Sequence, residues 1–240
     1  MRVAIVSDVH GNRRAFDAVV NDLHQVSPDL VLHGGDLGYG GAHSAEIIDA
    51  IRAYRWPGVR GNTDEMLWDQ QPLVDLANRQ PKLKPLLDRI QAAIPITCDW
   101  IGEERLSWLR GLPLRHSEGD ITVVHAGPDD TWWSPMANAT DEELERVYGP
   151  LKTRVMVYGH IHHPYVRSLA GMTVANSGAV SLSYDGDWRA SYLVVDGEDV
   201  SIRRVEYDVE SEAKDLLSSG FPNAEWQARI LRAGKYCPPE

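Results

Sequence analysis

The sequence has few of the features that would indicate a secreted or membrane-spanning protein. It contains only 2 cysteines among 240 residues, Cys98 and Cys237, and their wide separation matches no metal-binding or disulfide pattern. No apolar run approaches the roughly 20 residues that a membrane-spanning helix needs. The first residues, MRVAIVSD, lack the apolar stretch and cleavage site of a signal peptide. We therefore expect a cytoplasmic protein in a reducing compartment.

Positive charge is also scarce. The chain has 24 Lys and Arg residues against 35 Asp and Glu residues, so its formal net charge is -11. An acidic surface repels the phosphate backbone of nucleic acids and anionic membranes. We expect no broad nucleic-acid surface and no membrane partner. A local cationic site stays open, because bound metal ions would supply one.

The first half of the chain alternates between strand and helix patterns. Arg2 to Val6 has the length of a buried strand, and apolar residues then recur at helical spacing from Ala15 to Leu23. The unit repeats with predicted strands at Asp29 to Leu32 and at Gly58 to Arg60. Because βαβ alternation is typical of a parallel sheet covered by helices, we expect an α/β fold with a largely parallel sheet.

Later segments depart from this alternation. Residues 65–117 are leucine-rich and punctuated by prolines, which indicates a helical insertion or cap. Strands return at Ile121 to Val124 and at Val155 to Tyr158, and residues 165–205 predict short antiparallel strands with Gly/Asp turns. Apolar residues at helical spacing predict a last helix over Asn223 to Ala233. With 43% apolar residues, the chain can bury a full core.

Each predicted core strand ends at a residue that can bind a metal ion. The segments are Asp8-Val9-His10, Gly34-Gly35-Asp36, Gly61-Asn62, His125-Ala126-Gly127 and Gly159-His160-Ile161-His162. The carboxyl ends of strands in an open α/β sheet are where sites assemble. Two carboxylates, one amide and four imidazoles suit Mn, Fe, Zn or Ni better than Ca or Mg. Seven donors exceed the needs of one tetrahedral zinc ion. They fit two metal ions that share a carboxylate, which can clamp a phosphate ester and generate hydroxide.

Taken in order, the D-x-H, GGD, GN, VHAG and GHIH segments resemble the calcineurin-like metallophosphoesterase family over residues 1 to about 205. Within it, the chain looks like the small bacterial and archaeal phosphodiesterase branch, on the evidence of Ser7 to Asn12, of GNTD in place of GNHD and of Asn176 to Val180. That branch usually has Asn-Pro-Gly-Ser where this chain has Asn-Ser-Gly-Ala. The resemblance implies a four-layer α/β/β/α sandwich, with residues 1–240 forming one metallophosphoesterase domain and the insertion at about 65–117 within it.

The same resemblance implies a role for each donor. The first metal ion would be held by Asp8, His10 and His162, the second by Asn62, His125 and His160, and Asp36 would bridge them. A bridging ligand must be a carboxylate, whereas a neutral imidazole has one lone pair for a single metal ion. Asp36, Asn62 and His125 are the expected catalytic residues. The expected cofactors are two divalent or trivalent ions of Mn, Fe, Zn or Ni, with Mn favoured for activity.

Thr63 occupies a position where the family usually has a histidine that protonates the leaving group. A threonine hydroxyl donates a hydrogen bond but is no proton source near pH 7. We therefore expect a metal-dependent phosphoric ester hydrolase that favours phosphodiesters and other good leaving groups over alkyl monoesters. His116 and His163 are alternative acids. His163, next to His162 in an extended segment, points to the opposite side and is at best a supporting residue.

Several other residues have a structural interpretation beside a functional one. Arg13 and Arg14 either steer phosphate or lie on an exposed helical turn. Trp132 and Trp133 either form a wall of the cleft or pack under a loop. Asp64 is expected to support a ligand or to cap a helix.

Other activities of such proteins stay open. A phosphomonoesterase or protein phosphatase is one alternative, although the protein phosphatases carry Asp-Arg-Gly and GNHE where this chain has Asp36-Leu37-Gly38 and GNTD. A dinucleoside polyphosphate hydrolase is another. A catalytically inactive binding scaffold, as in one retromer subunit, would be expected to lack some ligands, whereas all seven are present here. The expected partner is a phosphate-ester small molecule or a nucleotide, and the oligomeric state is open.

Overall fold

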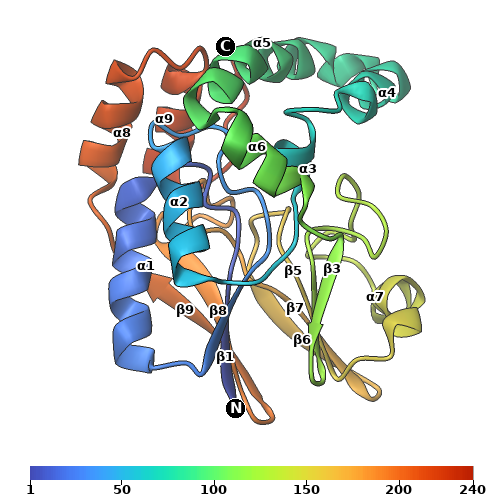
Figure 1. Cartoon of the computed structure of the whole chain (residues 1–240). Helices are drawn as coiled ribbons and strands as arrows, with labels where there is room; N and C mark the ends of the chain where they lie inside the picture. Colours follow the sequence, from blue (N-terminus) through green and yellow to red (C-terminus); the bar gives the residue numbers. More distant parts are fainter. Residues whose placement is uncertain (240) are drawn as a thin grey trace.

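Two β-sheets packed face to face form the centre of the computed structural model, which describes residues 1–239 (Figure 1). The first sheet has the order β2-β1-β8-β9 and the second β3-β4-β5-β7-β6. The strands of the first are β1 (Arg2–Val6), β2 (Leu30–His33), β8 (Ala190–Asp196) and β9 (Asp199–Val205). Those of the second are β3 (Arg115–Glu118), β4 (Ile121–Val124), β5 (Val155–Tyr158), β6 (Tyr165–Leu169) and β7 (Met172–Asn176).

Helices cover both outer faces, which gives the expected four-layer α/β/β/α sandwich. In Figure 1, α1 and α2 flank the first sheet on the left, α7 flanks the second on the right, and α5, α6, α8 and α9 lie towards the top. The helices are α1 (Arg13–Val26), α2 (Ser44–Tyr54), α3 (Asn62–Glu65), α4 (Gln71–Arg79), α5 (Lys84–Ile101), α6 (Glu103–Arg110), α7 (Asp141–Tyr148), α8 (Val209–Ser218) and α9 (Ala224–Ala233). None of the helices in residues 1–239 is long and apolar enough to span a bilayer.

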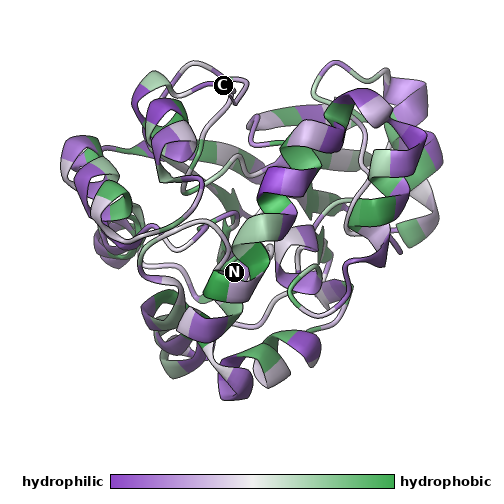
Figure 2. Ribbon diagram, turned by 90° about the horizontal axis from the view of Figure 1, so that it is seen from above, coloured by the Kyte–Doolittle hydropathy of each residue, from purple (hydrophilic) through white to green (hydrophobic). Residues whose placement is uncertain are grey.

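The apolar runs of the sequence fill the space between the sheets. Val3 and Ile5 of β1 pack with Val123 of β4 and Val157 of β5, and all four side chains are fully buried. Burying one such side chain contributes about 1.5–3 kcal/mol. The outer helices are amphipathic: hydrophobic and hydrophilic residues alternate along them in Figure 2. Their apolar faces complete the core.

The pairing of β1 brings the first two polar loops together. Strand β1 runs parallel to β2 and antiparallel to β8. Beyond the strands, the Asp8 N–H donates to the Gly35 carbonyl and the His10 N–H to the Asp36 carbonyl, at 3.0 Å each. The loop after β1 therefore lies alongside the loop after β2.

Two details of the expected fold are wrong. Gly58 to Arg60 is not a strand: Gly58 forms one isolated bridge with His33, and the Arg60 N–H leaves the ladder to donate to the Pro113 carbonyl. The sheet of the first half is not largely parallel either, because β8 and β9, which are antiparallel as expected for residues 165–205, complete the first sheet. The strands β1, β4 and β5 and helix α9 are confirmed, α9 beginning one residue later than expected.

The leucine-rich interval 65–117 contains helices α4, α5 and α6. Its last residues already belong to the edge strand β3, which pairs antiparallel with β4. Pro95 lies inside α5 without ending it, and Thr97, two residues on, donates from its hydroxyl to the carbonyl of Ala93, one turn before it. The helical part of the interval therefore ends at Arg110, and α5 runs above the ends of the strands in Figure 1.

Candidate metal centre

The seven sequence-predicted donors converge at one end of the sandwich. They leave the ends of β1, β2, β4 and β5 and the first turn of α3. Six of them, Asp8, His10, Asp36, Asn62, His125 and His162, are at most 9% exposed, and His160 is partly exposed. A buried cluster of this polarity costs free energy unless each donor has a partner. The partners therefore decide what the cluster can bind.

The backbone is bent sharply at most of these donors. Asp8, His10, Asp36, His160 and His162 all have a positive φ, between 49° and 67°. Such left-handed conformations cost side-chain-bearing residues about 1–3 kcal/mol each and persist where the surrounding structure holds them. The fold thus maintains strain at five of the seven positions, which is typical of functional sites.

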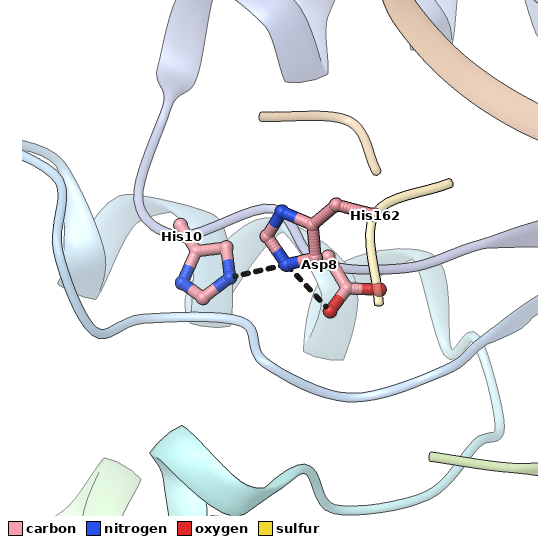
Figure 3. A group of neighbouring side chains, drawn as sticks. All are labelled: Asp8, His10 and His162. Carbon is pink, nitrogen blue, oxygen red and sulfur yellow. Dashed lines mark hydrogen bonds and ion pairs between the residues drawn. The ribbon is translucent and has the colours of Figure 1, made fainter. Parts of the chain in front are cut away.

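One group consists of Asp8, His10 and His162 (Figure 3). Nε2 of His162 lies 3.2 Å from Asp8 Oδ1 and 3.3 Å from Nε2 of His10. The other nitrogen of each ring is held by a backbone carbonyl. Nδ1 of His10 donates to the Tyr39 carbonyl at 2.8 Å, and Nδ1 of His162 donates to the Leu182 carbonyl at 2.7 Å. With Nδ1 protonated, a neutral ring directs the Nε2 lone pair into the group.

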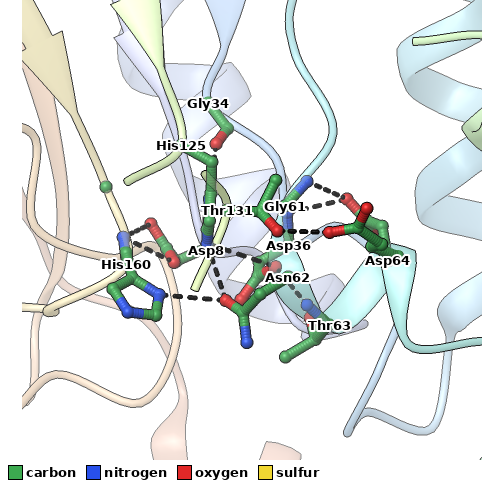
Figure 4. Close-up of polar contacts among 12 residues, drawn as sticks. Asp8, Gly34, Asp36, Gly61, Asn62, Thr63, Asp64, His125, Thr131 and His160 are labelled. Atoms are coloured by element: carbon green, nitrogen blue, oxygen red, sulfur yellow. Dashed lines mark hydrogen bonds and ion pairs between the residues drawn. The ribbon is translucent and has the colours of Figure 1, made fainter. Parts of the chain in front are cut away.

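A second group surrounds Asn62 (Figure 4). Its Oδ1 lies 2.9 Å from Nε2 of His125 and 2.9 Å from Nδ1 of His160. His125 is fixed like the first two histidines, since its Nδ1 donates to the Gly34 carbonyl at 2.8 Å. His160 differs, because it faces Asn62 with Nδ1 while its backbone N–H donates to the Asp8 carboxylate.

Asp36 lies between the two groups. Its Oδ2 is 3.6 Å from Nε2 of His10, and its Oδ1 is 3.4 Å from Nε2 of His125. The Thr63 N–H donates to Oδ1 at 2.9 Å, which fixes the carboxylate (Figure 4). Asp8 also reaches both sides, because its carboxylate lies close to donors of Asp36 and His125 as well as to those of its own group. Two carboxylates are thus shared between the histidines of the two groups.

The environment acts differently on the four rings: the pKa of His10 and His160 is lowered, and that of His125 and His162 is raised. Burial lowers the pKa of His10, and it lowers that of His160 to about 4 with a further contribution from His125. For His162 burial acts the same way, but the Asp8 carboxylate outweighs it and the pKa is raised. Burial alone would raise the pKa of Asp8, yet the His162 ring brings it below its usual range.

This donor set fits metal ions. The acceptor atoms of the imidazoles, the amide and the two carboxylates face inward and lie close to one another. The cluster has fewer donor protons than acceptor lone pairs, so some acceptors have no hydrogen-bond donor. A positive charge between them removes the mutual repulsion. Nitrogen and oxygen donors with carbonyl-anchored rings are the surroundings that Mn, Fe, Zn and Ni ions prefer.

Asp64 supports the centre from outside it. Its carboxylate accepts the backbone N–H groups of Asp36, Leu37 and Gly61 at 2.9–3.0 Å. Burial and the Asp36 charge raise its pKa to about 7, while the N–H donors act in the opposite direction. The expected supporting role therefore corresponds to a specific contact: Asp64 joins the Asp36 loop to the turn that carries Asn62. Gly61 has no side chain at this junction because a Cβ there would collide with the Asp36 carboxylate.

A pocket of about 150 Å³ opens beside the donors. Its floor includes His10, Asp36, Asn62, His160 and His162. Its walls come from Tyr39, Thr63, Ile90 of α5, Leu182, Tyr184, and Trp226, Gln227 and Ile230 of α9. Of these wall residues, sequence reasoning singled out only Thr63. The signal of Trp226 and Ile230 was apolar helical spacing, which indicates burial and says nothing of what is buried against them.

The other sequence candidates lie away from the pocket. His116 is on the edge strand β3 and His163 is half-buried, and neither lines the pocket. Arg13 pairs with Asp17 and Arg14 with Asp215 at the surface, which agrees with the structural interpretation.

The two tryptophans that follow β4 also lie elsewhere. Trp132 packs against the core, and Trp133 is 51% exposed. Neither lines the pocket. Packing under a loop is therefore correct for Trp132, whereas Trp133 projects from the loop.

Known proteins share both this fold and this sequence pattern. A metallophosphoesterase from Sphaerobacter thermophilus has 27% sequence identity and a TM-score of 0.77, over 98% of this chain and 100% of that one. The Pyrococcus horikoshii protein PH1004 shares the fold with a TM-score of 0.82 at 19% identity, over 98% of this chain and 99% of that one.

Two curated proteins are similar in sequence. The protein MJ0912 of Methanocaldococcus jannaschii is 28% identical over 97% of this chain and 98% of its own length. The symmetrical bis(5'-nucleosyl)-tetraphosphatase of Nitrosococcus oceani is 31% identical over 61% of this chain, and the match spans about half, 51%, of that enzyme. Residues 1–200 match the calcineurin-like phosphoesterase superfamily domain. The chain therefore belongs to the calcineurin-like phosphoesterase superfamily.

Proposed function

We propose that this protein is a dinuclear metal-dependent phosphoesterase that hydrolyses phosphodiesters and other phosphate esters with good leaving groups. The observation that carries the proposal is the position of Asp36, whose two oxygens face histidines of different donor groups. In the proposed site, Asp8, His10 and His162 hold one ion, Asn62, His125 and His160 hold the other, and Asp36 bridges them. When bound, the ions would polarise the phosphoryl group and lower the pKa of a water molecule.

The residues of the chain then position the ester. The floor of the pocket presents the donors of both groups, so a phosphoryl group placed there touches both halves of the site. The Asn62 carbonyl oxygen faces His125 and His160, which leaves its amide hydrogens for a phosphate oxygen. Asp36 is held by the Thr63 N–H and, through its own N–H, by Asp64. This support keeps the bridging carboxylate in place while the ester reacts.

Within residues 1–239, the pocket lining contains no histidine besides the proposed metal ligands, which supports the preference for good leaving groups. Thr63 lines the pocket where a family histidine would stand, and neither His116 nor His163 lines it. General acid catalysis contributes about 10²–10⁴ in rate, and its loss slows poor leaving groups most. Aryl esters and phosphodiesters with acidic leaving alcohols should therefore react faster than alkyl monoesters.

Hydrolysis of a nucleotide phosphoanhydride is a second candidate, because the chain is 31% identical to a tetraphosphatase over 153 residues. A phosphoanhydride releases a good leaving group, so its hydrolysis likewise needs no general acid to protonate that group. Diadenosine tetraphosphate with Mn²⁺ tests this candidate by release of nucleotide products. A phosphomonoesterase or protein phosphatase and a metal-free binding scaffold of the same fold are the remaining alternatives. The expected cytoplasmic location and the preference for Mn stay predictions.

The test compares bis-p-nitrophenyl phosphate with p-nitrophenyl phosphate in the presence of Mn²⁺, Zn²⁺, Fe²⁺ or Ni²⁺, with Asp36→Asn as the blank. Faster diester hydrolysis that falls at least about 100-fold in the blank supports the proposal. Faster monoester hydrolysis would indicate a phosphomonoesterase instead. A protein that binds no metal and hydrolyses neither ester would have to be a scaffold.

A further inference from the structure

The wall of the pocket opposite the metal donors is built by segments distant from them in sequence. Ile90 belongs to α5, and Trp226, Gln227 and Ile230 belong to α9 (Figure 1). Residues 224–233 lie beyond the part of the chain that matches the superfamily domain, which ends at residue 200. Two separate parts of the chain therefore build this wall, one within the matched domain and one beyond it.

Two aromatic side chains of the wall use their polar atoms elsewhere. The Tyr39 hydroxyl donates to the Ile90 carbonyl at 2.9 Å, and the Trp226 indole N–H donates to the Cys237 carbonyl at 2.6 Å. The Tyr184 ring stacks on His162, with 4.6 Å between ring centroids. These residues offer ring surface to a bound molecule, and Ile90 and Ile230 add aliphatic surface. Most of the wall therefore suits an apolar group of limited size.

Two polar atoms of the wall remain without a partner. Oε1 of Gln227 and Oγ1 of Thr63 are buried and make no hydrogen bond with any residue in 1–239. Gln227 is only 4% exposed, and its amide is confined, because a Cβ on Gly40 would come within 2.8 Å of Nε2. A buried acceptor without a donor costs free energy, and native proteins seldom retain one without a reason. A bound molecule with an N–H or O–H group would remove this cost.

We propose that Gln227 selects the organic part of the substrate by accepting a hydrogen bond from it. This inference rests on the proposed phosphoesterase function. With its phosphoryl group at the donors, the substrate directs its non-leaving group towards α5 and α9. The pocket volume of about 150 Å³ is below the roughly 300–1,000 Å³ of pockets that enclose drug-sized ligands. The favoured substrate is a compact ester, of nucleoside size or smaller, with a flat or apolar body that bears an N–H or O–H donor.

A matched pair of substrates isolates this contact. Thymidine 5'-p-nitrophenyl phosphate and bis-p-nitrophenyl phosphate release the same leaving group, but only the thymidine arm carries N–H and O–H donors. We expect Gln227→Met to lower the ratio of kcat/KM for the thymidine ester to that for the bis-aryl ester about threefold to tenfold, the loss of one hydrogen bond. Gln227→Asn shortens the side chain by one carbon and should change the ratio in the same direction. This variant replaces Gln227→Met in the experiment if the Met variant folds poorly.

The control is Gln91→Met, the same substitution on α5. Gln91 binds Gln70 and does not line the pocket, so this variant should keep the wild-type ratio. Equal losses on both esters in the Gln227 variants, with unchanged thermal midpoints, would overturn the role of Gln227 and leave the phosphoesterase proposal intact. A wild-type protein that hydrolyses neither ester with any of the four metal ions would instead contradict the proposed function itself.

Discussion

Nε2 of His10 lies 3.3 Å from Nε2 of His162, and both rings donate from Nδ1 to backbone carbonyls. Two neutral rings held in this way direct lone pairs at each other. A hydrogen bond between them requires a second proton on one ring; burial lowers the pKa of His10, whereas the Asp8 carboxylate raises that of His162. In the metal-free protein a proton on His162 can therefore occupy this contact, and a cation bound to both nitrogens would take its place.

Metal ions should therefore stabilise the fold. Adding Mn²⁺ to chelator-treated protein is expected to raise the free energy of unfolding by about 2.7 kcal/mol when free metal is 100 times its Kd. Denaturant unfolding at increasing metal concentrations measures the effect. The increase should be much smaller in His162→Phe. If the unfolding midpoint stays constant with Mn²⁺, Zn²⁺, Fe²⁺ and Ni²⁺ alike, the cluster is no metal site.

Asp64 offers a test of support from outside the donor set. Asp64→Ala removes the acceptor of three backbone N–H groups, including that of Asp36. We expect metal affinity to fall about 10–100-fold and the free energy of unfolding to fall by about 1–3 kcal/mol. Asp69→Ala is the matched control, since Asp69 accepts one exposed N–H from Gln71. Similar metal affinities in the two variants would show that Asp64 does not position the centre.

Thr63 is expected to set the preference between diesters and monoesters. Thr63→His places an imidazole in the pocket wall, where it can protonate a leaving group. The ratio of diester to alkyl monoester hydrolysis should fall about 10-fold or more, mainly through faster monoester turnover. Thr63→Val, which removes the hydroxyl at similar size, is the control and should not gain monoester activity. An unchanged ratio in Thr63→His would refute the explanation.

His33 should make the fold sensitive to acid. It is fully buried against Trp108, neither ring nitrogen has a partner in residues 1–239, and burial, with His116, lowers its pKa to about 3. The unfolded chain binds the proton with a pKa near 6.5, so protonation favours unfolding. The contribution is complete above about pH 6.5 and is lost towards pH 3, at up to about 1.4 kcal/mol per pH unit.

His33→Leu should remove this dependence. The measurement is denaturant unfolding of wild type and variant between pH 7 and pH 4.5, with exposed His24→Leu as the control. The stability difference between wild type and His33→Leu should shift in favour of the variant as the pH falls. Parallel pH profiles for the two proteins would contradict the assignment.

The sequence predicted the fold class, and it picked out seven residues that converge at one end of the sandwich, because both follow from local patterns; their role as metal ligands stays a prediction. The apolar run of β1 and the polar residues that follow it are adjacent in the chain, so Asp8 and His10 could be placed at a strand end without a structure. The prediction of a third strand at Gly58 to Arg60 was wrong for a physical reason. After Pro57, which has no N–H, only Val59 donates to His33, and Arg60 turns to Pro113.

The remaining features depend on long-range packing. The tautomer of each histidine follows from a distant carbonyl, as with His125 and Gly34, which are 91 positions apart. The wall residue Gln227 looks like an ordinary helix position until α9 is placed above the strand ends. The left-handed backbone at His160 and His162 likewise has no sequence signal, since neither residue is glycine.

Because β1 lies between β2 and β8, the proposed metal centre can be completed only after β8 has been synthesised. Arg2 pairs with Asp196, 194 positions later, so the strand that leads to Asp8 acquires its second neighbour only when most of the chain has left the ribosome. All seven donors emerge earlier, as the last of them is His162. An interrupted chain would carry every ligand and still lack the sheet that aligns them. Closing this long loop is slow, so metal loading by the nascent chain should wait until β8 has been synthesised.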